Sequence, residues 1–279
     1  MVDFEDFNPS EVFDLSLNAN HSVCLANSFV HGRYSLSLTE MRLFLLAISQ
    51  IKPEHERTLY TYQASLTDLA SFLGVAPSNL SRDLKSVCSN LVGQVVYIED
   101  GKDWEMFHLV SYAKYKTGDG VLTLRLSNEI MPYAVGLKKY YTSVLLGDIL
   151  KFSCKYSSPL FLRLKSDIGF SQYTKYEFNF SVSDIRSMFR IPDKKYKKAY
   201  DLLNYTVVPA LNEISKSDFA YIWDYEEIRS RKRGHPIEGV SFKMVLFDNR
   251  QIKDRFLELY SSENVPPYFL IARIKKELS

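Results

Sequence analysis

Two stretches of the chain repeat one pattern of apolar and polar positions. Residues 60–75 read YTYQASLTDLASFLGV and residues 176–191 read YEFNFSVSDIRSMFRI. At an offset of 116 residues (181 minus 65), Ser65 matches Ser181 and Asp68 matches Asp184. Each copy predicts a short alternating strand and then an amphipathic helix, with the serine as cap and the acid in the positive first turn. We interpret the chain as two related units in series.

A second helix is predicted after each copy. Gly74 to Pro77 end the first helix, and Ser78 is expected to cap the next one. The apolar stripe of that helix consists of Leu80, Leu84, Val87, Cys88 and Leu91. In the other unit, Pro192-Asp193 is expected to begin the counterpart, KKYKKAYDLLNYTVV, which Pro209 then kinks or splits. Its inward positions are Tyr196, Ala199, Leu203 and Val207. Two helices joined by a short turn, the second with a polar and basic outer face, predict a helix-turn-helix in each unit.

Strand-like sequence surrounds these helix pairs. A capping box at Ser37 to Glu40 opens the deeply buried helix MRLFLLAISQIK (41–52), and its counterpart covers 158–164. Alternating strands are predicted at 95–98, 105–115, 121–126, 219–225 and 240–247. Helix, helix-turn-helix and β-hairpin make a winged helix, so the fold class is α+β with two tandem winged-helix domains. The predicted divisions are an acidic segment 1–24, domains at 25–135 and 136–250 with a linker within 132–147, and a helical tail 251–279.

Composition and charge narrow the class of protein. Hydrophobic residues make up 46% and charged residues 24% of the 279 residues, as in a globular chain. No apolar run reaches the ~20 residues of a membrane helix, and the N-terminus lacks a signal-peptide pattern. The three cysteines form no CxxC pair, which favours a reduced, cytoplasmic, zinc-free protein. Residues 1–159 carry 14 Lys and Arg against 17 Asp and Glu, whereas residues 160–279 carry 21 against 16. The basic second half is compatible with a polyanionic partner.

Sequence signatures of enzymes are missing. The five histidines are never two or four residues apart, so neither HxH nor HExxH occurs. The phosphate-binding loop GxxxxGK[ST], the dinucleotide motif GxGxxG and the nucleophile motif GxSxG are also absent. We therefore expect no catalytic activity, no metal and no cofactor.

The candidate site residues are those expected to face DNA. On the first recognition helix they are Ser78, Asn79, Ser81, Arg82 and Lys85. Arg82 is suited to bidentate contact with guanine and Asn79 with adenine, and phosphate contact by this face is an equally open interpretation. On the second helix they are Lys194, Lys195, Lys197, Lys198 and Asp201, at the end that enters the major groove. At the tip of the second wing they are Arg229, Arg231, Lys232 and Arg233, and arginine is favoured in a narrow minor groove.

The chain resembles the initiator Rep proteins of iteron-containing bacterial plasmids. LSLTEMRLFLLAISQI is similar to their first-domain helix, and YKKAYDLLNYTVVPALNEI (196–214) resembles a lysine-rich recognition helix followed by their P-A-x-x-E-I stretch. The resemblance covers roughly residues 25–250. The chain departs from the family pattern at Phe189-Arg190-Ile191, where many members have L-G-I. This departure leaves the geometry of the second turn open.

The resemblance implies a replication initiator without nuclease or ATPase activity. As a monomer it would bind direct repeats of double-stranded origin DNA. As a homodimer formed through the first domain it would repress its own gene at an inverted repeat. Host helicase, host initiator and chaperones are the implied protein partners. Two alternatives remain open from the sequence, namely a tandem winged-helix transcriptional regulator without a replication role and a protein-binding scaffold.

Overall fold

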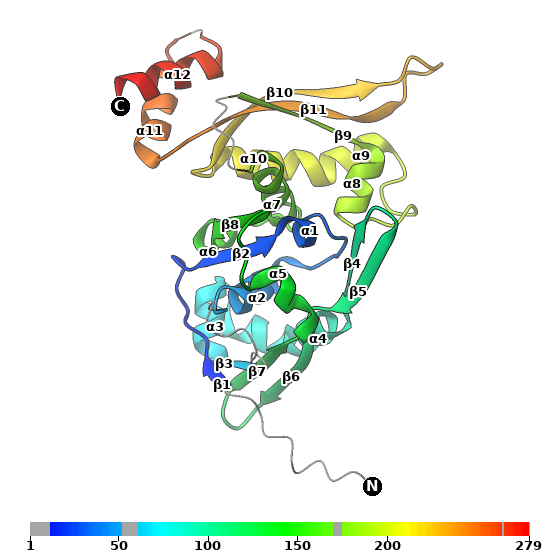
Figure 1. Cartoon of the computed structure of the whole chain (residues 1–279), viewed down its shortest axis with the longest axis vertical. Helices are drawn as coiled ribbons and strands as arrows, with labels where there is room; N and C mark the ends of the chain where they lie inside the picture. Colours follow the sequence, from blue (N-terminus) through cyan, green and yellow to red (C-terminus); the bar gives the residue numbers. More distant parts are fainter. Residues whose placement is uncertain (1–11, 52–60, 170–174, 264, 279) are drawn as a thin grey trace. The chain divides into compact units, whose positions relative to one another are not determined.

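The structure is a computed structural model that describes residues 12–51, 61–169, 175–263 and 265–278. It divides into two compact units, Met1–Leu150 and Lys151–Ser279 (Figure 1). Residues 1–11 of the predicted acidic N-terminal segment lie outside the described residues. Residues 12–24 of that segment belong to the first unit, because strands β1 (Val12–Asp14) and β2 (Ser22–Ala26) pair with strands from its interior.

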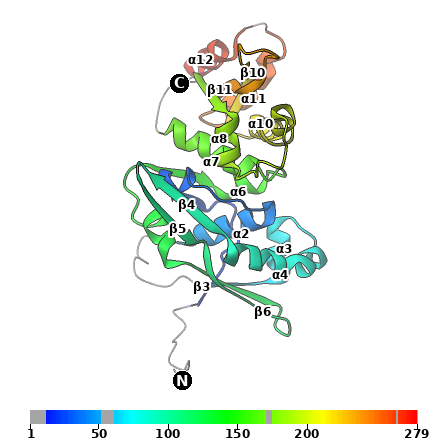
Figure 2. The same cartoon turned by 90° about the vertical axis from the view of Figure 1, so that its right-hand side faces the viewer.

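The described part of the first unit contains a helix-turn-helix, further helices before and after it in the sequence, and three small sheets. Its helices are α1 (Asn27–Val30), α2 (Leu38–Ile48), α3 (Leu66–Leu73), α4 (Pro77–Gly93), α5 (Met131–Ala134) and α6 (Leu146–Leu150), with a 3-10 turn at Asn128–Ile130. Its strands are β1 (Val12–Asp14), β2 (Ser22–Ala26), β3 (Thr61–Ser65), β4 (Val95–Asp100), β5 (Asp103–His108), β6 (Val110–Lys116), β7 (Val121–Leu126) and β8 (Tyr141–Leu145). The sheet orders are β1-β3-β7-β6, β2-β8 and β4-β5. In Figure 2, β6 runs below α4, and the two elements are in contact.

The second unit has one three-stranded sheet, ordered β10-β11-β9. Its strands are β9 (Lys175–Ser181), β10 (Ala220–Arg229) and β11 (Ile237–Leu246). Its helices are α7 (Ser157–Ile168), α8 (Val182–Met188), α9 (Ala199–Leu202), α10 (Val208–Lys216), α11 (Arg250–Tyr260) and α12 (Pro267–Glu277), with a π-helical turn at Leu203–Val207. Figure 1 shows β10 and β11 as one long hairpin, the wing of this unit.

The two units share their strand topology, which confirms the internal repeat. In the first unit, β3 precedes the helix-turn-helix and pairs antiparallel with β7, the second strand of the hairpin β6–β7. In the second unit, β9 pairs in the same way with β11, the second strand of the hairpin β10–β11. Strand, helix-turn-helix and hairpin therefore close into one winged helix per unit, as the sequence predicted.

The predicted serine caps are formed in both units. Ser65 accepts a hydrogen bond from the backbone N–H of Asp68 at the start of α3. Ser181 accepts one from the N–H of Asp184, and the Asp184 carboxylate accepts one from the Ser181 N–H, which completes a capping box on α8. These bonds satisfy N–H groups that a helix leaves without internal partners. The same pattern of residues thus begins the first helix of each helix-turn-helix.

The buried helix α2 holds the end of α3, the first helix of the helix-turn-helix, through Arg42. Every residue from Glu40 to Ile48 is buried, as expected for a helix that is apolar on nearly every side. The Arg42 guanidinium nevertheless lies in this core and donates to the backbone carbonyls of Leu73 (2.6 Å) and Leu150 (2.8 Å). A cation is favourable at the negative carboxyl end of a helix, so Arg42 fixes the last turns of α3 and α6. The sequence pattern did not predict this role.

Two predictions for the first unit differ from the structure. The single strand expected over 105–115 is two strands in different sheets, because buried Leu109 separates β5 from β6. The interdomain linker expected within 132–147 instead contains β8, which pairs antiparallel with β2. The contact boundary therefore falls after Leu150, about 15 residues later than the predicted division at 135/136. A strand whose partner lies over a hundred residues away gives no local signal.

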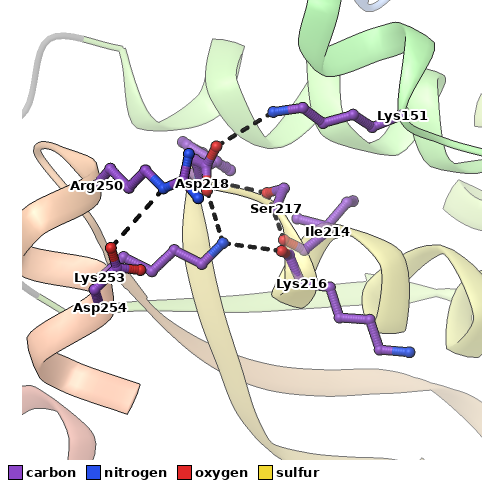
Figure 3. A network of polar contacts seen from close by, with 9 residues as sticks. Lys151, Ile214, Lys216, Ser217, Asp218, Arg250, Lys253 and Asp254 are labelled. Atoms are coloured by element: carbon purple, nitrogen blue, oxygen red, sulfur yellow. Dashed lines mark hydrogen bonds and ion pairs between the residues drawn. The ribbon is translucent and has the colours of Figure 1, made fainter. Parts of the chain in front are cut away.

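The predicted C-terminal tail folds into α11 and α12, which pack on the base of the wing. Phe256, Ile271 and Ile274 are fully buried there against Val245 and half-buried Trp223. A polar network continues this contact toward α10 (Figure 3). The Lys253 ammonium donates to the carbonyl of Lys216 at 3.1 Å and to Asp218 at 2.7 Å, and Lys151 donates to Asp218 at 3.2 Å. The hydrogen bond from Lys253 is the main reason why the pKa of Asp218 lies below its ordinary value.

Candidate nucleic-acid interface

In the first unit, the candidate residues share the outer face of one continuous helix, α4. Leu80, Leu84 and Val87 turn their side chains into the core with Leu91. The five predicted contact residues are all exposed: Ser78, Asn79, Ser81, Arg82 and Lys85. The predicted cap by Ser78 is wrong, because Ala76 is the N-cap and makes no side-chain bond. Pro77 occupies the first helical position, where the missing N–H costs nothing and the fixed φ suits the helix.

Arg82 already has an ionic partner on the same helix. Its Nε and one terminal nitrogen donate to the two carboxylate oxygens of Asp83, at 2.8 and 3.0 Å. This bidentate pair raises the pKa of Arg82 and lowers the pKa of Asp83. Both side chains are more than half exposed, so the pair contributes little to stability and can open. Bidentate contact of Arg82 with a guanine therefore requires Asp83 to be released first.

The four lysines that the sequence assigned to the second recognition helix lie before that helix in the structure. The helix expected from Pro192-Asp193 onward begins only at Ala199, so that prediction is wrong for Lys194, Lys195 and Lys197, while Lys198 is the N-cap. We call residues 192–198 the lysine turn, in which all four lysines are exposed. Lysines are unfavourable in the positive first turn of a helix, and Tyr196 has a left-handed φ of 49°. Both facts explain the later start.

Arg186 of α8 organises the lysine turn. Its guanidinium donates to the carbonyls of Pro192 (3.2 Å), Lys195 (3.1 Å) and Tyr196 (2.6 Å). Three hydrogen bonds from one charged group fix the backbone that carries the lysines. Sequence analysis missed this residue, because the carbonyls it binds are up to ten positions away and leave no periodic signal.

The two helix-turn-helix units have a left-handed residue at the same position of the turn, although the second turn is much longer. Gly74 ends α3 with a φ of 67°, and Arg190, at the same offset of 116 residues, has a φ of 49°. Glycine adopts this left-handed region without cost, whereas arginine does so at some energetic expense. Arg190 therefore takes the left-handed φ of Gly74, while the second turn continues to Ala199 and so differs from the first in length.

The second recognition helix is interrupted, as Pro209 predicted. A π-helical turn at Leu203–Val207 separates α9 from α10, and Pro209 lies in the first turn of α10. Proline has no N–H to donate and its ring displaces the carbonyl four residues earlier, so the wider turn accommodates it. Leu203 and Val207 are buried as expected, while Tyr196 and Ala199 are only partly buried.

Two exposed tyrosines accompany the predicted polar residues on this helix. Tyr200 is 58% and Tyr205 is 62% exposed, and the Tyr205 ring stacks on Tyr196 of the lysine turn at 5.6 Å. Asp201 is partly buried beside them. The sequence interpretation assigned most aromatic residues to the core and did not single out these two. Only the structure identifies them as candidate interface residues, because it shows that they are exposed beside the lysine turn.

The four basic residues predicted at the tip of the wing are all exposed. Arg231, Lys232 and Arg233 lie in the loop between β10 and β11, and Gly234 there has a φ of 85°. Arg229 donates to the Glu227 carboxylate and to the carbonyl of His235 (3.2 Å), so it closes the loop. Since α9 contacts β11, the recognition helix and the wing belong to one packed body.

The described part of the chain has neither a metal-binding cluster nor a membrane-spanning helix. Among these residues no three His, Cys, Asp or Glu side chains gather closely enough to hold a metal ion. No helix of the same residues has the length and apolar character needed to cross a lipid bilayer. Cys88, which the sequence interpretation placed in the core, is half-buried, and burial raises the pKa of its thiol to about 11.

Comparison with known proteins agrees with this geometry. A solved structure of the Pi initiator protein in complex with iteron DNA is similar to the chain with a TM-score of 0.63 at 19% identity, covering 83% of this chain and 100% of that one. Two family models match the sequence: "Initiator Replication protein, WH1" over residues 22–165 and "Initiator Rep protein, WH2" over residues 181–244. The first model alone covers half of the chain, from β2 into α7. The protein therefore belongs to the initiator replication protein family and carries its two winged-helix domains in series.

Proposed function

We propose that this protein initiates plasmid replication by binding direct repeats of double-stranded origin DNA. The observation that carries the proposal is the pair of winged helices. In the first, the outer face of the second helix is polar, and in the second, four exposed lysines directly precede the second helix. The similar Pi initiator structure contains iteron DNA, which supports the same kind of target here. Exposed lysines and arginines would supply affinity through phosphates, and the faces of α4 and α9 would supply specificity through base edges.

A monomer with two recognition helices should protect about 20 bp of one repeat. Helices that enter successive major-groove segments lie roughly 34 Å or 10 bp apart, and the two ends of the site would meet different residues. Footprinting on a single direct repeat, combined with mass measurement of the complex, tests this expectation. Protection of only about 10 bp by one chain, or an obligatory dimer on that repeat, would show that one unit does not read DNA. We would then withdraw the contacts of the Arg82 face first, because α4 carries less positive charge.

We further propose that a homodimer, formed through the first unit, represses the protein's own gene. A two-fold protein matches a palindrome, so the dimer should favour an inverted repeat in the operator. Host helicase, host initiator and chaperones are the proposed protein partners, and the cytoplasm is the proposed compartment. Sedimentation on direct-repeat and inverted-repeat duplexes distinguishes the monomeric and dimeric complexes.

We propose that the protein acts without nuclease or ATPase chemistry. When supercoiled origin plasmid is incubated with the protein, Mg²⁺ or Mn²⁺ and ATP, the DNA should stay uncut and no phosphate should be released. Gel electrophoresis and a phosphate assay provide the two measurements. A covalent tyrosine–DNA adduct would contradict the proposal, because its formation breaks a phosphodiester bond of the DNA.

A transcriptional regulator without a replication role is the second candidate function. One observation favours it, a groove of about 460 Å³ between α4 and β6 with Leu84, Cys88 and Lys114 among its lining residues. A regulator would use such a groove for a small ligand and would need only a symmetric operator. Tandem repeats of about 20 bp beside the gene, and loss of plasmid replication when the gene is deleted, would identify the initiator.

A further inference from the structure

Glu213 of α10 binds the segment with which the second unit begins. Its carboxylate accepts hydrogen bonds from the backbone N–H groups of Ser153 and Cys154 (3.0 to 3.2 Å) and from the Ser157 hydroxyl (2.6 Å). The Ser153 hydroxyl donates to it as well. Burial alone would raise the pKa of Glu213, but these hydrogen bonds outweigh burial, and the pKa lies below its ordinary value. The side chain is therefore ionised and fully engaged at neutral pH.

The Glu213 carboxylate also provides the negative charge and the hydrogen-bond acceptor that are missing at the N-cap of α7. The N-cap residue of α7 is Tyr156, whose side chain makes no capping hydrogen bond. The positive end of a helix favours a nearby anion, and Glu213 provides one from 56 residues away, through buried Ser157. The hydrogen bonds thus tie α10, which continues the recognition helix, to the first turn of α7.

The segment that Glu213 holds also supports the lysine turn. Tyr156, between Cys154 and Ser157, packs on Phe189 with ring centroids 4.8 Å apart. Burial, and to a smaller degree neighbouring Tyr196, raise the pKa of Tyr156. Tyr196 is the residue whose carbonyl accepts from Arg186 and whose ring stacks on Tyr205 of the recognition helix. A continuous series of contacts therefore runs from Glu213 through Tyr156 to the lysine turn.

We propose that Glu213 is a positioning residue for DNA recognition. Its carboxylate fixes the segment 153–157, and through Tyr156 it sets the place of the lysine turn relative to the recognition helix. The inference rests on the proposed function, because it concerns how the second unit reads a specific site. Glu213 itself faces the interior contacts described above and needs no contact with DNA.

A positioning role predicts different effects on specific and non-specific binding. Phosphate contacts by long lysine side chains tolerate small displacements of the turn and are shared by every DNA sequence. Base contacts depend on the placement of donors and acceptors against one edge of a base pair. Loss of the Glu213 hydrogen bonds should therefore reduce the ratio of specific to non-specific affinity while non-specific affinity stays nearly constant.

The test compares Glu213→Gln with Glu258→Gln in the full chain. Glutamine has one acceptor oxygen, and its amide N–H₂ would oppose the N–H groups of Ser153 and Cys154. Glu258 is exposed on α11 and forms an ion pair with Arg255 of the same helix at 2.7 Å, so the same substitution there is the matched control. The probes are a duplex selected from random DNA by the wild-type protein and a scrambled duplex of equal composition.

We expect Glu213→Gln to lower the affinity ratio about tenfold and Glu258→Gln to leave it unchanged. Ser157→Ala removes one donor and keeps the charge, so it should lower the ratio less, and in the same direction. Measurements are made well below the melting temperature of each variant. A ratio retained by Glu213→Gln, or equal losses on both duplexes, would overturn the positioning role alone. A wild-type protein without preference for the selected duplex would overturn the proposed function itself, and this inference with it.

Discussion

Replacement of Lys197 and Lys198 together by alanine is expected to weaken DNA binding more than Arg82→Ala does. Both lysines are exposed on a turn whose backbone Arg186 holds in place, so they are already placed to meet phosphates. Arg82 is paired with Asp83 and must lose that partner before it contacts DNA. Each lost phosphate contact lowers the slope of log K against log[salt] by ~0.9, so the double variant should flatten it by about 1.8.

Titrations of a labelled duplex over a series of salt concentrations measure both effects. Lys138→Ala with Lys139→Ala is the matched control, because these two adjacent lysines are also exposed but lie between α5 and β8 of the first unit. We expect the control to change neither the affinity nor the slope. An unchanged slope in Lys197→Ala with Lys198→Ala would mean that the lysine turn does not touch DNA, and the proposed contact of the second unit with phosphates through these lysines would fail.

The sequence predicted the features of the fold that local pattern determines. The caps at Ser65 and Ser181, the buried helix from Leu38 and the break at Pro209 all follow from residues within a few positions of one another. Each of these features depends on whether a short stretch of residues is helical, so residue type and spacing are sufficient to predict it. Because the same pattern of strand, cap and helix recurs 116 residues later, the sequence indicated two winged helices.

The features that the sequence missed depend on contacts between distant residues. The lysine turn looked helical because lysine and tyrosine tolerate a helix, but Arg186 and the left-handed Tyr196 give its backbone another conformation. The true extent of the first unit depends on β8, whose partner β2 precedes it by more than a hundred residues. The candidate interface was therefore found by residue type, while its actual geometry required the tertiary structure.

Phe256→Ala should be the most destabilising single change in the second unit. The Phe256 side chain is fully buried between the wing and the C-terminal helices, with ring centroids 5.1 Å from Tyr221 and 5.4 Å from Phe247. Truncation removes this packing and leaves a cavity, and phenylalanine to alanine in a core costs about 3–5 kcal/mol. Since Tyr221 and Phe247 belong to the base of the wing hairpin, the loss should loosen the wing as well as α11.

Urea unfolding measures this loss if the two units are followed separately. The chain has two tryptophans, Trp104 in the first unit and Trp223 in the second, so a Trp104→Phe background restricts the fluorescence signal to the second unit. Leu257→Ala is the matched control, because the next residue on α11 is 43% exposed and its truncation should cost well under about 1 kcal/mol. A Phe256→Ala midpoint close to that of the control, with an unchanged m-value, would mean that α11 and α12 add little to the stability of the unit. The tail would then be an appendage of the winged helix, and the buried cluster around Phe256 would have no part in holding the wing against the recognition helix.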